Sequence, residues 1–123
     1  MIALVGATGR SGAALARALA GAGIAFIPVA RSAAKWAALG LPGEFRAADL
    51  RDPAALKRAL AGADRVVSTV HARWVPALLA AAEPGASFVL MGSTRRFSQW
   101  PDAHGDGVRA GEAAFLASGR RGV

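Results

Sequence analysis

Three glycines near the N-terminus carry the clearest chemical signal in the sequence. Gly6, Gly9 and Gly12 form the pattern G-x-x-G-x-x-G, directly after the apolar run Ile2–Val5 and before a helical pattern. In this context the first glycine permits a tight turn, the second lets phosphate approach the backbone, and the third lets the helix pack closely on the strand. The helix N-terminus then offers free N–H groups to a pyrophosphate. We therefore expect a bound dinucleotide here, the alternative being a glycine-rich turn without a ligand.

The residues after the second expected strand indicate which dinucleotide is preferred. Sites that prefer NAD usually carry an acid about 20 residues beyond the glycine turn, where it bonds the ribose hydroxyls. This chain has no acid before Glu44, and its second strand leads instead into Arg31 and Ser32. Arg31 can pair with a 2′-phosphate and Ser32 can donate to it, assisted by Arg10 and Lys35. We expect NADP(H) to be preferred over NAD(H), the alternative being solvated surface arginines.

Asp49 and Leu50 follow the third expected strand. Asp49 can accept a hydrogen bond from the adenine amino group while Leu50 packs on the ring. Asp49 can equally belong to the turn that leads to Asp52, the expected N-cap of the next helix. Both interpretations of Asp49 stay open at this point.

Short apolar runs alternate with helical stretches along the whole chain. We expect strands over 2–5, 24–29, 44–48, 65–70 and 87–91, and helices over 10–22, 32–39, from Asp52 to Gly62, 73–83 and 106–117. A loop of roughly fifteen residues separates the last strand from the last helix, which is long for a connection without a function. This alternation predicts an α/β fold, a Rossmann doubly wound parallel sheet with five strands in the order 3-2-1-4-5. Residues 1–123 form one domain, which ends where a sixth strand is expected, so we expect a C-terminal truncation.

Composition narrows the function classes. The chain has 123 residues, no cysteine and a formal charge of +7. Disulfides and Cys-ligated zinc are therefore excluded, no metal site is expected, and a reducing cytoplasm is the expected location. No apolar run is long enough to span a membrane, and the N-terminus does not resemble a signal peptide. The basic residues are scattered without aromatic stacking positions, which argues against nucleic acid as a partner.

Six segments resemble the atypical short-chain dehydrogenase/reductase group, in its NmrA-like branch of NAD(P)H-binding Rossmann proteins. They are VGATGRSG at 5–12, VARS at 29–32, ADLRD at 48–52, VVSTV at 66–70, VLMGST at 89–94 and EAAFLASG at 112–119. The resemblance implies cofactor-binding positions at Gly6, Thr8, Gly9, Arg10, Ser11, Gly12, Arg31, Asp49 and Leu50. It also implies that Thr69, Val70 and His71 lie beside the nicotinamide ribose. Gly92, Ser93 and Thr94 would border the reaction site, where Ser93 or Thr94 would orient a substrate oxygen.

The chain departs from this family at its catalytic positions. The wider family uses a tyrosine and a lysine four residues apart, and this chain contains no tyrosine. The two positions fall on His104 and Val108. Histidine is the side chain that ordinarily changes charge near neutral pH, so His104 can act as a general acid or be an exposed loop residue. His71 can bond the cofactor ribose or a substrate, or cap the next helix.

The resemblance leads to two hypotheses about function. The first is the cofactor-binding part of an NADP(H)-dependent oxidoreductase or epimerase-like enzyme that acts on a small carbonyl or hydroxyl substrate of unknown identity. The second is a non-catalytic dinucleotide sensor, which the missing tyrosine favours. The sequence leaves a homo-oligomer open.

Overall fold

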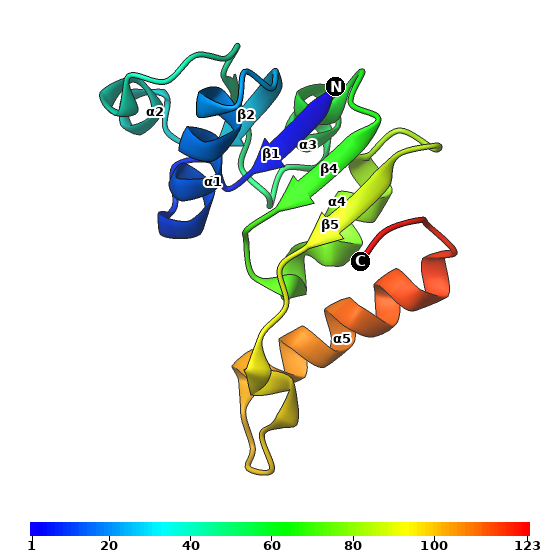
Figure 1. Ribbon diagram of the computed structural model, residues 1–123. Helices are drawn as coiled ribbons and strands as arrows, with labels where there is room; N and C mark the ends of the chain where they lie inside the picture. Colours follow the sequence, from blue (N-terminus) through cyan, green and yellow to red (C-terminus); the bar gives the residue numbers. More distant parts are fainter.

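The computed structural model describes residues 1–123 as a parallel sheet with helices on both faces (Figure 1). The strands are β1 (Ile2–Val5), β2 (Phe26–Ala30), β3 (Arg46–Ala47), β4 (Arg65–Ser68) and β5 (Ser87–Leu90). The helices are α1 (Arg10–Gly21), α2 (Ala33–Leu39), α3 (Pro53–Leu60), α4 (Val75–Ala81) and α5 (Ala103–Ser118), with 3-10 turns at η1 (Ala72–Trp74) and η2 (Thr94–Phe97). The strand order β3-β2-β1-β4-β5 confirms the predicted fold class and topology.

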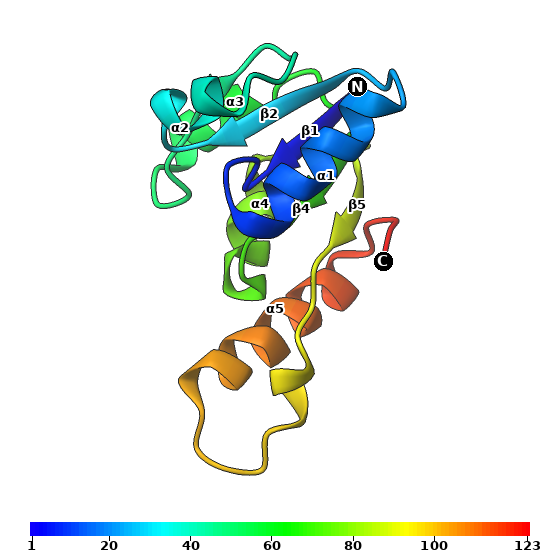
Figure 2. The same ribbon diagram turned by 60° about the vertical axis from the view of Figure 1, so that its left-hand side comes forward.

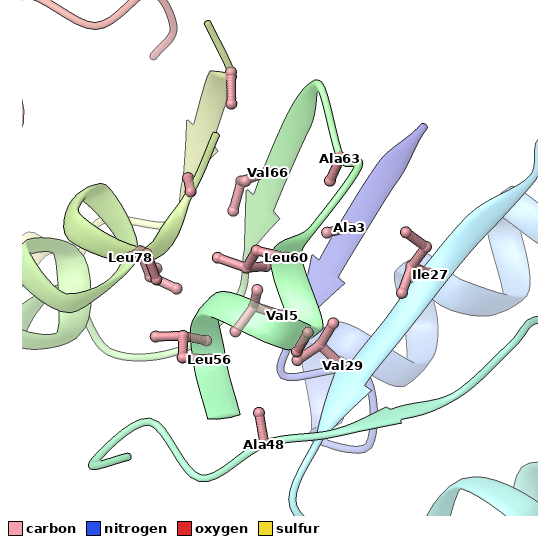
Figure 3. Packing of buried hydrophobic residues seen from close by; sticks show 14 of the residues in the cluster. Ala3, Val5, Ile27, Val29, Ala48, Leu56, Leu60, Ala63, Val66 and Leu78 are labelled. Atoms are coloured by element: carbon pink, nitrogen blue, oxygen red, sulfur yellow. The ribbon is translucent and has the colours of Figure 1, made fainter. Parts of the chain in front are cut away.

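The strands alternate their side chains between two apolar layers, as the period of two requires. Ala3 and Val5 of β1 pack with the helix layer of α3 and α4, together with Leu56, Leu60 and Leu78 (Figure 3). Leu4 points to the opposite face, in a cluster that holds Ala7, Ala16, Phe26 and Trp36 from the α1 and α2 side. Because both faces of the sheet are covered at its centre, β1 and β2 consist only of apolar residues, as buried parallel strands usually do.

Glycine and small residues let α1 approach β1 closely. Gly12 is buried, and a Cβ built on it would overlap the carbonyl oxygen of Gly6. Gly6 itself has φ +85°, a conformation that side chains of L residues rarely adopt. These two glycines are therefore required by the fold, and they fix where α1 begins relative to the end of β1.

The last part of the chain differs from the prediction. Helix α5 begins at Ala103 rather than residue 106, because the Asp102 carboxylate accepts a hydrogen bond from the His104 N–H and caps the helix. The expected loop is therefore shorter and contains η2, and its segment projects from the body of the fold (Figures 1 and 2). The prediction that His104 lies in a loop was wrong, since it occupies the first turn of α5.

Other element boundaries moved by a few residues. β3 spans only two residues instead of 44–48, and β2 is shifted to Phe26–Ala30. The expected helix over 73–83 is divided into the 3-10 turn η1 and the shorter α4.

The C-terminal residues extend the sheet at the free edge of β5. The Phe88 N–H donates to the Arg121 carbonyl (2.9 Å), and the Leu90 N–H donates to the Val123 carbonyl (2.8 Å). The bridge between Phe88 and Gly122 is parallel, so these residues pair where a sixth strand was expected to begin. None of the helices is both long and apolar enough to cross a membrane.

Candidate functional site

A cleft of about 370 Å³ lies at the carboxyl ends of the central strands. Ligands of open α/β sheets bind at this edge, near the point where the strand order reverses. Nine residues proposed from the sequence line the cleft: Gly6, Thr8, Gly9, Arg31, Asp49, Leu50, Thr69, Val70 and His71. Five others do not line it: Arg10, Ser11, Gly12, Ser32 and Lys35. Arg51, Arg73 and Trp74 line the cleft too and were not among the proposed residues.

Gly9 differs from the other two glycines of the turn. A Cβ built on Gly9 would meet only the Gly6 carbonyl oxygen, at 3.4 Å, and the backbone is extended with φ −74°. The fold therefore tolerates a side chain at this position, although Gly9 lines the cleft. A glycine that the chain itself does not need is explained by something else that must approach the backbone closely, such as a phosphate.

The start of α1 is also open toward a ligand. Gly9 is the N-cap and provides no side-chain hydrogen bond, and no acidic residue lies in the first turn. The first N–H groups of a helix have no partner within the helix, and they favour a negative charge. The residues present thus fit a pyrophosphate group at this turn.

Thr69 connects the end of β4 to the glycine turn. Its hydroxyl donates to the carbonyl oxygen of Val5 at 3.1 Å, and the Gly6 carbonyl lies 3.4 Å from the same oxygen. A Cβ on Gly6 would lie 2.7 Å from this hydroxyl, so the two strands meet without space for a side chain. Thr69 therefore holds the turn in place as well as lining the cleft.

Arg31 is exposed at the end of β2 and forms no hydrogen bond or ion pair with the chain. Ser32 is the N-cap of α2, and its hydroxyl oxygen accepts from the Lys35 N–H at 3.2 Å. That hydrogen bond leaves the Ser32 O–H group free to donate. Lys35 is exposed and lies outside the cleft lining. Of these two cations at the end of β2, Arg31 is therefore the one that faces the cleft.

Asp49 forms a two-point contact with Arg51. The Arg51 Nη2 donates to Oδ2 at 2.8 Å and Nε donates to Oδ1 at 3.1 Å, while the Arg51 backbone N–H donates to Oδ1 at 2.9 Å. The side-chain hydrogen bonds from Arg51, followed by its backbone N–H, lower the pKa of Asp49 to about 2. The turn alternative for Asp49 is thus present, and the same residue also lines the cleft.

A second cavity of about 320 Å³ adjoins the cleft and shares Val70 and His71 with it. Ser93 and His104 line this second cavity, whereas Thr94 lines a separate surface hollow with Arg95 and Trp100. The structure therefore brings together two of the three proposed catalytic residues and separates Thr94 from them. The Ser93 hydroxyl oxygen also caps η2 by accepting from the Arg95 N–H at 3.2 Å.

His71 and His104 are in direct contact. Their ring centroids are 4.0 Å apart with an interplanar angle of 88°. The His71 Nδ1 accepts from the Arg73 N–H at 2.9 Å, so His71 caps η1, as one of the sequence alternatives proposed. Burial lowers the pKa of His71, the charges of His104 and Arg73 lower it further, and the backbone of His104 raises it by less than these together lower it. No group of three His, Asp or Glu side chains is arranged to hold a metal ion.

The sequence matches the NAD(P)H-binding family over residues 6–112. The chain belongs to this family. No curated protein matches it.

Solved structures of reductases share its fold. The NADPH-dependent quinone oxidoreductase QOR2 from Escherichia coli, complexed with NADPH, is 26% identical with a TM-score of 0.76, over 98% of this chain and 46% of that one. The Citrobacter sp. triphenylmethane reductase complexed with NADP(H) is 23% identical with a TM-score of 0.78, over 99% and 47%. A short-chain dehydrogenase/reductase from Vibrio parahaemolyticus is 16% identical with a TM-score of 0.78, over 99% and 72%. The chain thus spans less than half the length of the first two, and the last two show likeness of fold alone.

Proposed function

We propose that this NAD(P)H-binding domain prefers NADP(H) and forms the cofactor-binding part of an oxidoreductase of the NmrA-like branch that acts on a small carbonyl or hydroxyl compound. Arg31 carries the proposal, because it is a free guanidinium at the end of β2 and on the cleft wall. Planar, charge-assisted hydrogen bonds from a guanidinium suit a phosphate group. The family binds NAD(P)H, and the similar quinone oxidoreductase QOR2 was solved in complex with NADPH, which supports this choice.

The charge of the cleft supports the same cofactor. Its lining holds three arginines (Arg31, Arg51 and Arg73) and a single carboxylate, Asp49. Asp49 is already paired with Arg51, so it presents little free negative charge. The extra phosphate of NADP(H) therefore enters a site whose field attracts it, whereas the ribose hydroxyls of NAD(H) have no free carboxylate to bond at β2.

Each part of the cofactor has a place in this proposal. The glycine turn and the start of α1 hold the pyrophosphate, and Arg31 with Ser32 holds the 2′-phosphate. Asp49 and Leu50 contact the adenine, while Thr69, Val70 and His71 face the nicotinamide half. The nicotinamide supplies or accepts the hydride, and the protein supplies orientation and electrostatics.

An Arg31→Asp variant tests the cofactor preference. We expect NADPH affinity to fall about 10- to 100-fold, the equivalent of about 1.5–3 kcal/mol for hydrogen bonds to a charged group. NADH affinity should change much less. Arg17→Asp makes the same charge change on the exposed face of α1 outside the cleft and should affect neither cofactor strongly. Isothermal titration calorimetry with both cofactors measures the result, and equal losses for NADPH and NADH would contradict the proposal.

A dinucleotide sensor is the second candidate, favoured by the absence of tyrosine from the chain. A sensor would bind NADP⁺ and NADPH with equal affinity and would reduce no aldehyde or quinone. Hydride turnover with such a panel would instead support the oxidoreductase.

A further inference from the structure

Two cavities meet at His71, and one of them is not explained by cofactor binding. The second cavity has largely apolar walls, from Val70, Ala72, Met91 and Val108. Its only polar side chains are His71, Ser93 and His104. A small, mostly apolar molecule with one oxygen to bond fits these walls.

His71 has an unusual feature for a residue that caps a helix. Since Nδ1 accepts from the Arg73 N–H, the proton of the neutral ring is on Nε2. The Nε2 atom is buried and has no hydrogen-bond partner. A buried N–H without a partner costs free energy. Other helices of this chain are capped without that cost by small side chains, those of Ser32, Asp52 and Asp102.

Helix α5 is shaped to lie close to His71. A Cβ on Gly107 would lie 3.1 Å from Cε1 of His71, and a Cβ on Gly111 would overlap the carbonyl oxygen of Ala72. Glycine inside a helix is unfavourable by comparison with alanine, so these positions serve the close packing of α5 on η1. That packing places His104, in the first turn of α5, against the His71 ring.

The surroundings of His71 disfavour a positive charge on its ring. The His104 ring is in contact with it, and two imidazolium rings in contact would repel each other. Burial disfavours the charged form of His71, as do the charges of His104 and Arg73. His71 is therefore the disfavoured site for a positive charge in this pair, and His104 is the ring that is exposed to solvent. The nearby carboxylates, Asp102 and Asp106, are paired with Arg95 and Arg109.

We propose that His104 is the proton donor for reduction of a small apolar aldehyde, ketone or quinone in the second cavity, and that His71 positions it. The inference rests on the proposed function, because reduced nicotinamide supplies the hydride that the carbonyl carbon accepts. In the same step an N–H bond of the His104 imidazolium breaks and an O–H bond forms on the carbonyl oxygen. With an aldehyde or ketone the products are the alcohol, oxidised cofactor and a neutral imidazole, which regains its proton from water. With a quinone, the carbinol formed at the carbonyl carbon becomes the hydroquinone when its C–H proton is lost to water and the second carbonyl oxygen gains a proton. Ser93 donates a hydrogen bond to the same oxygen.

A histidine NMR titration tests the pair without requiring turnover. The Cε1–Hε1 signals of His71 and His104 are followed from pH 4 to 9 in the full chain. We expect His71 to titrate below the range of exposed histidines, and its midpoint to rise in His104→Gln, because that variant removes a neighbouring positive charge. Saturating NADP⁺ should shift the His71 signal, since His71 also lines the cleft. A His71 midpoint that is unchanged in His104→Gln would overturn the pairing.

Reduction of menadione and 4-nitrobenzaldehyde by NADPH tests the proton transfer. His104→Gln should lower kcat at least tenfold, leave the Kd for NADPH unchanged, and remove the fall in kcat at rising pH. His71→Asn should move the pH midpoint of kcat, which loss of a helix cap alone would not do. Gln99→Ala, an exposed change in the same segment, is the matched control. Wild-type kinetics in His104→Gln, or no reduction of either probe by a chain that binds NADPH, would overturn the inference. Failure to bind NADPH would instead refute the proposed function.

Discussion

Two glycines of the same turn should respond differently to alanine, because only one of them is required by the fold. In Gly12→Ala the new Cβ overlaps the Gly6 carbonyl oxygen and lies 2.9 Å from the Thr69 hydroxyl. The Gly6 backbone cannot move aside as the end of a flexible side chain can. We therefore expect a loss of about 1–3 kcal/mol in the free energy of unfolding. In Gly9→Ala the nearest atom is 3.4 Å away. Stability should then change by no more than about 1 kcal/mol.

Cofactor binding should be sensitive to Gly9, the glycine that the fold does not require. A Cβ at Gly9 would lie where the pyrophosphate is proposed to approach. The affinity of Gly9→Ala for NADPH should therefore fall at least about tenfold, or about 1.4 kcal/mol. Urea unfolding followed by circular dichroism measures stability, and calorimetric titration measures the Kd. Gly21→Ala, whose Cβ would have no neighbour within 4 Å, controls for the substitution itself. A wild-type Kd for NADPH in Gly9→Ala, or a destabilisation as large as that of Gly12→Ala, would contradict these expectations.

Two further predictions concern stability. Asp52→Ala should lower the free energy of unfolding by about 1 kcal/mol, because the Asp52 carboxylate accepts a hydrogen bond from the Ala55 N–H at 3.1 Å and caps α3. Urea denaturation measures this loss, and an unchanged midpoint would contradict the prediction. Arg95 lowers the pKa of Asp102 to about 2 through its hydrogen bonds, so this pair contributes stability above the ordinary pKa of an aspartate and loses it as pH falls toward 2. Arg95→Gln should therefore be less stable than wild type at pH 7, with a smaller difference at pH 2, and a difference independent of pH would refute the assignment.

The strand order could be predicted because the signals for it are local. Each apolar run is followed by a break and a helical pattern, and right-handed crossovers restrict how such units can be arranged. The start of α5 was missed for a physical reason. Gly105 and Gly107 favour a loop by propensity, but Gly105, Val108 and Gly111 are buried in the packed helix, and tertiary packing outweighs propensity.

Site residues could be predicted where a local sequence motif defines their position in the fold. Contacts between distant segments of the chain could not be predicted in this way. The glycine turn, Arg31 and Asp49 lie at strand ends that the pattern defines. Arg51 reaches the cleft through a turn, although the D-x-R spacing of an aspartate and an arginine is a signal that could have indicated the pair. The contact between His71 and His104 depends on how η1 packs against α5, which neither residue's neighbours in sequence reveal.

The central claim is that the cleft binds NADP(H), and the tryptophans provide a direct test. Trp74 lines the cleft, Trp36 is buried between Phe26 and Phe45, and Trp100 is 81% exposed on the projecting segment. Titration of the chain with NADPH should quench tryptophan fluorescence saturably, with tighter binding than NADH, and Trp74→Phe should remove most of the quenching while calorimetry still detects binding. If neither fluorescence nor calorimetry shows saturable binding of NADPH, the account is contradicted.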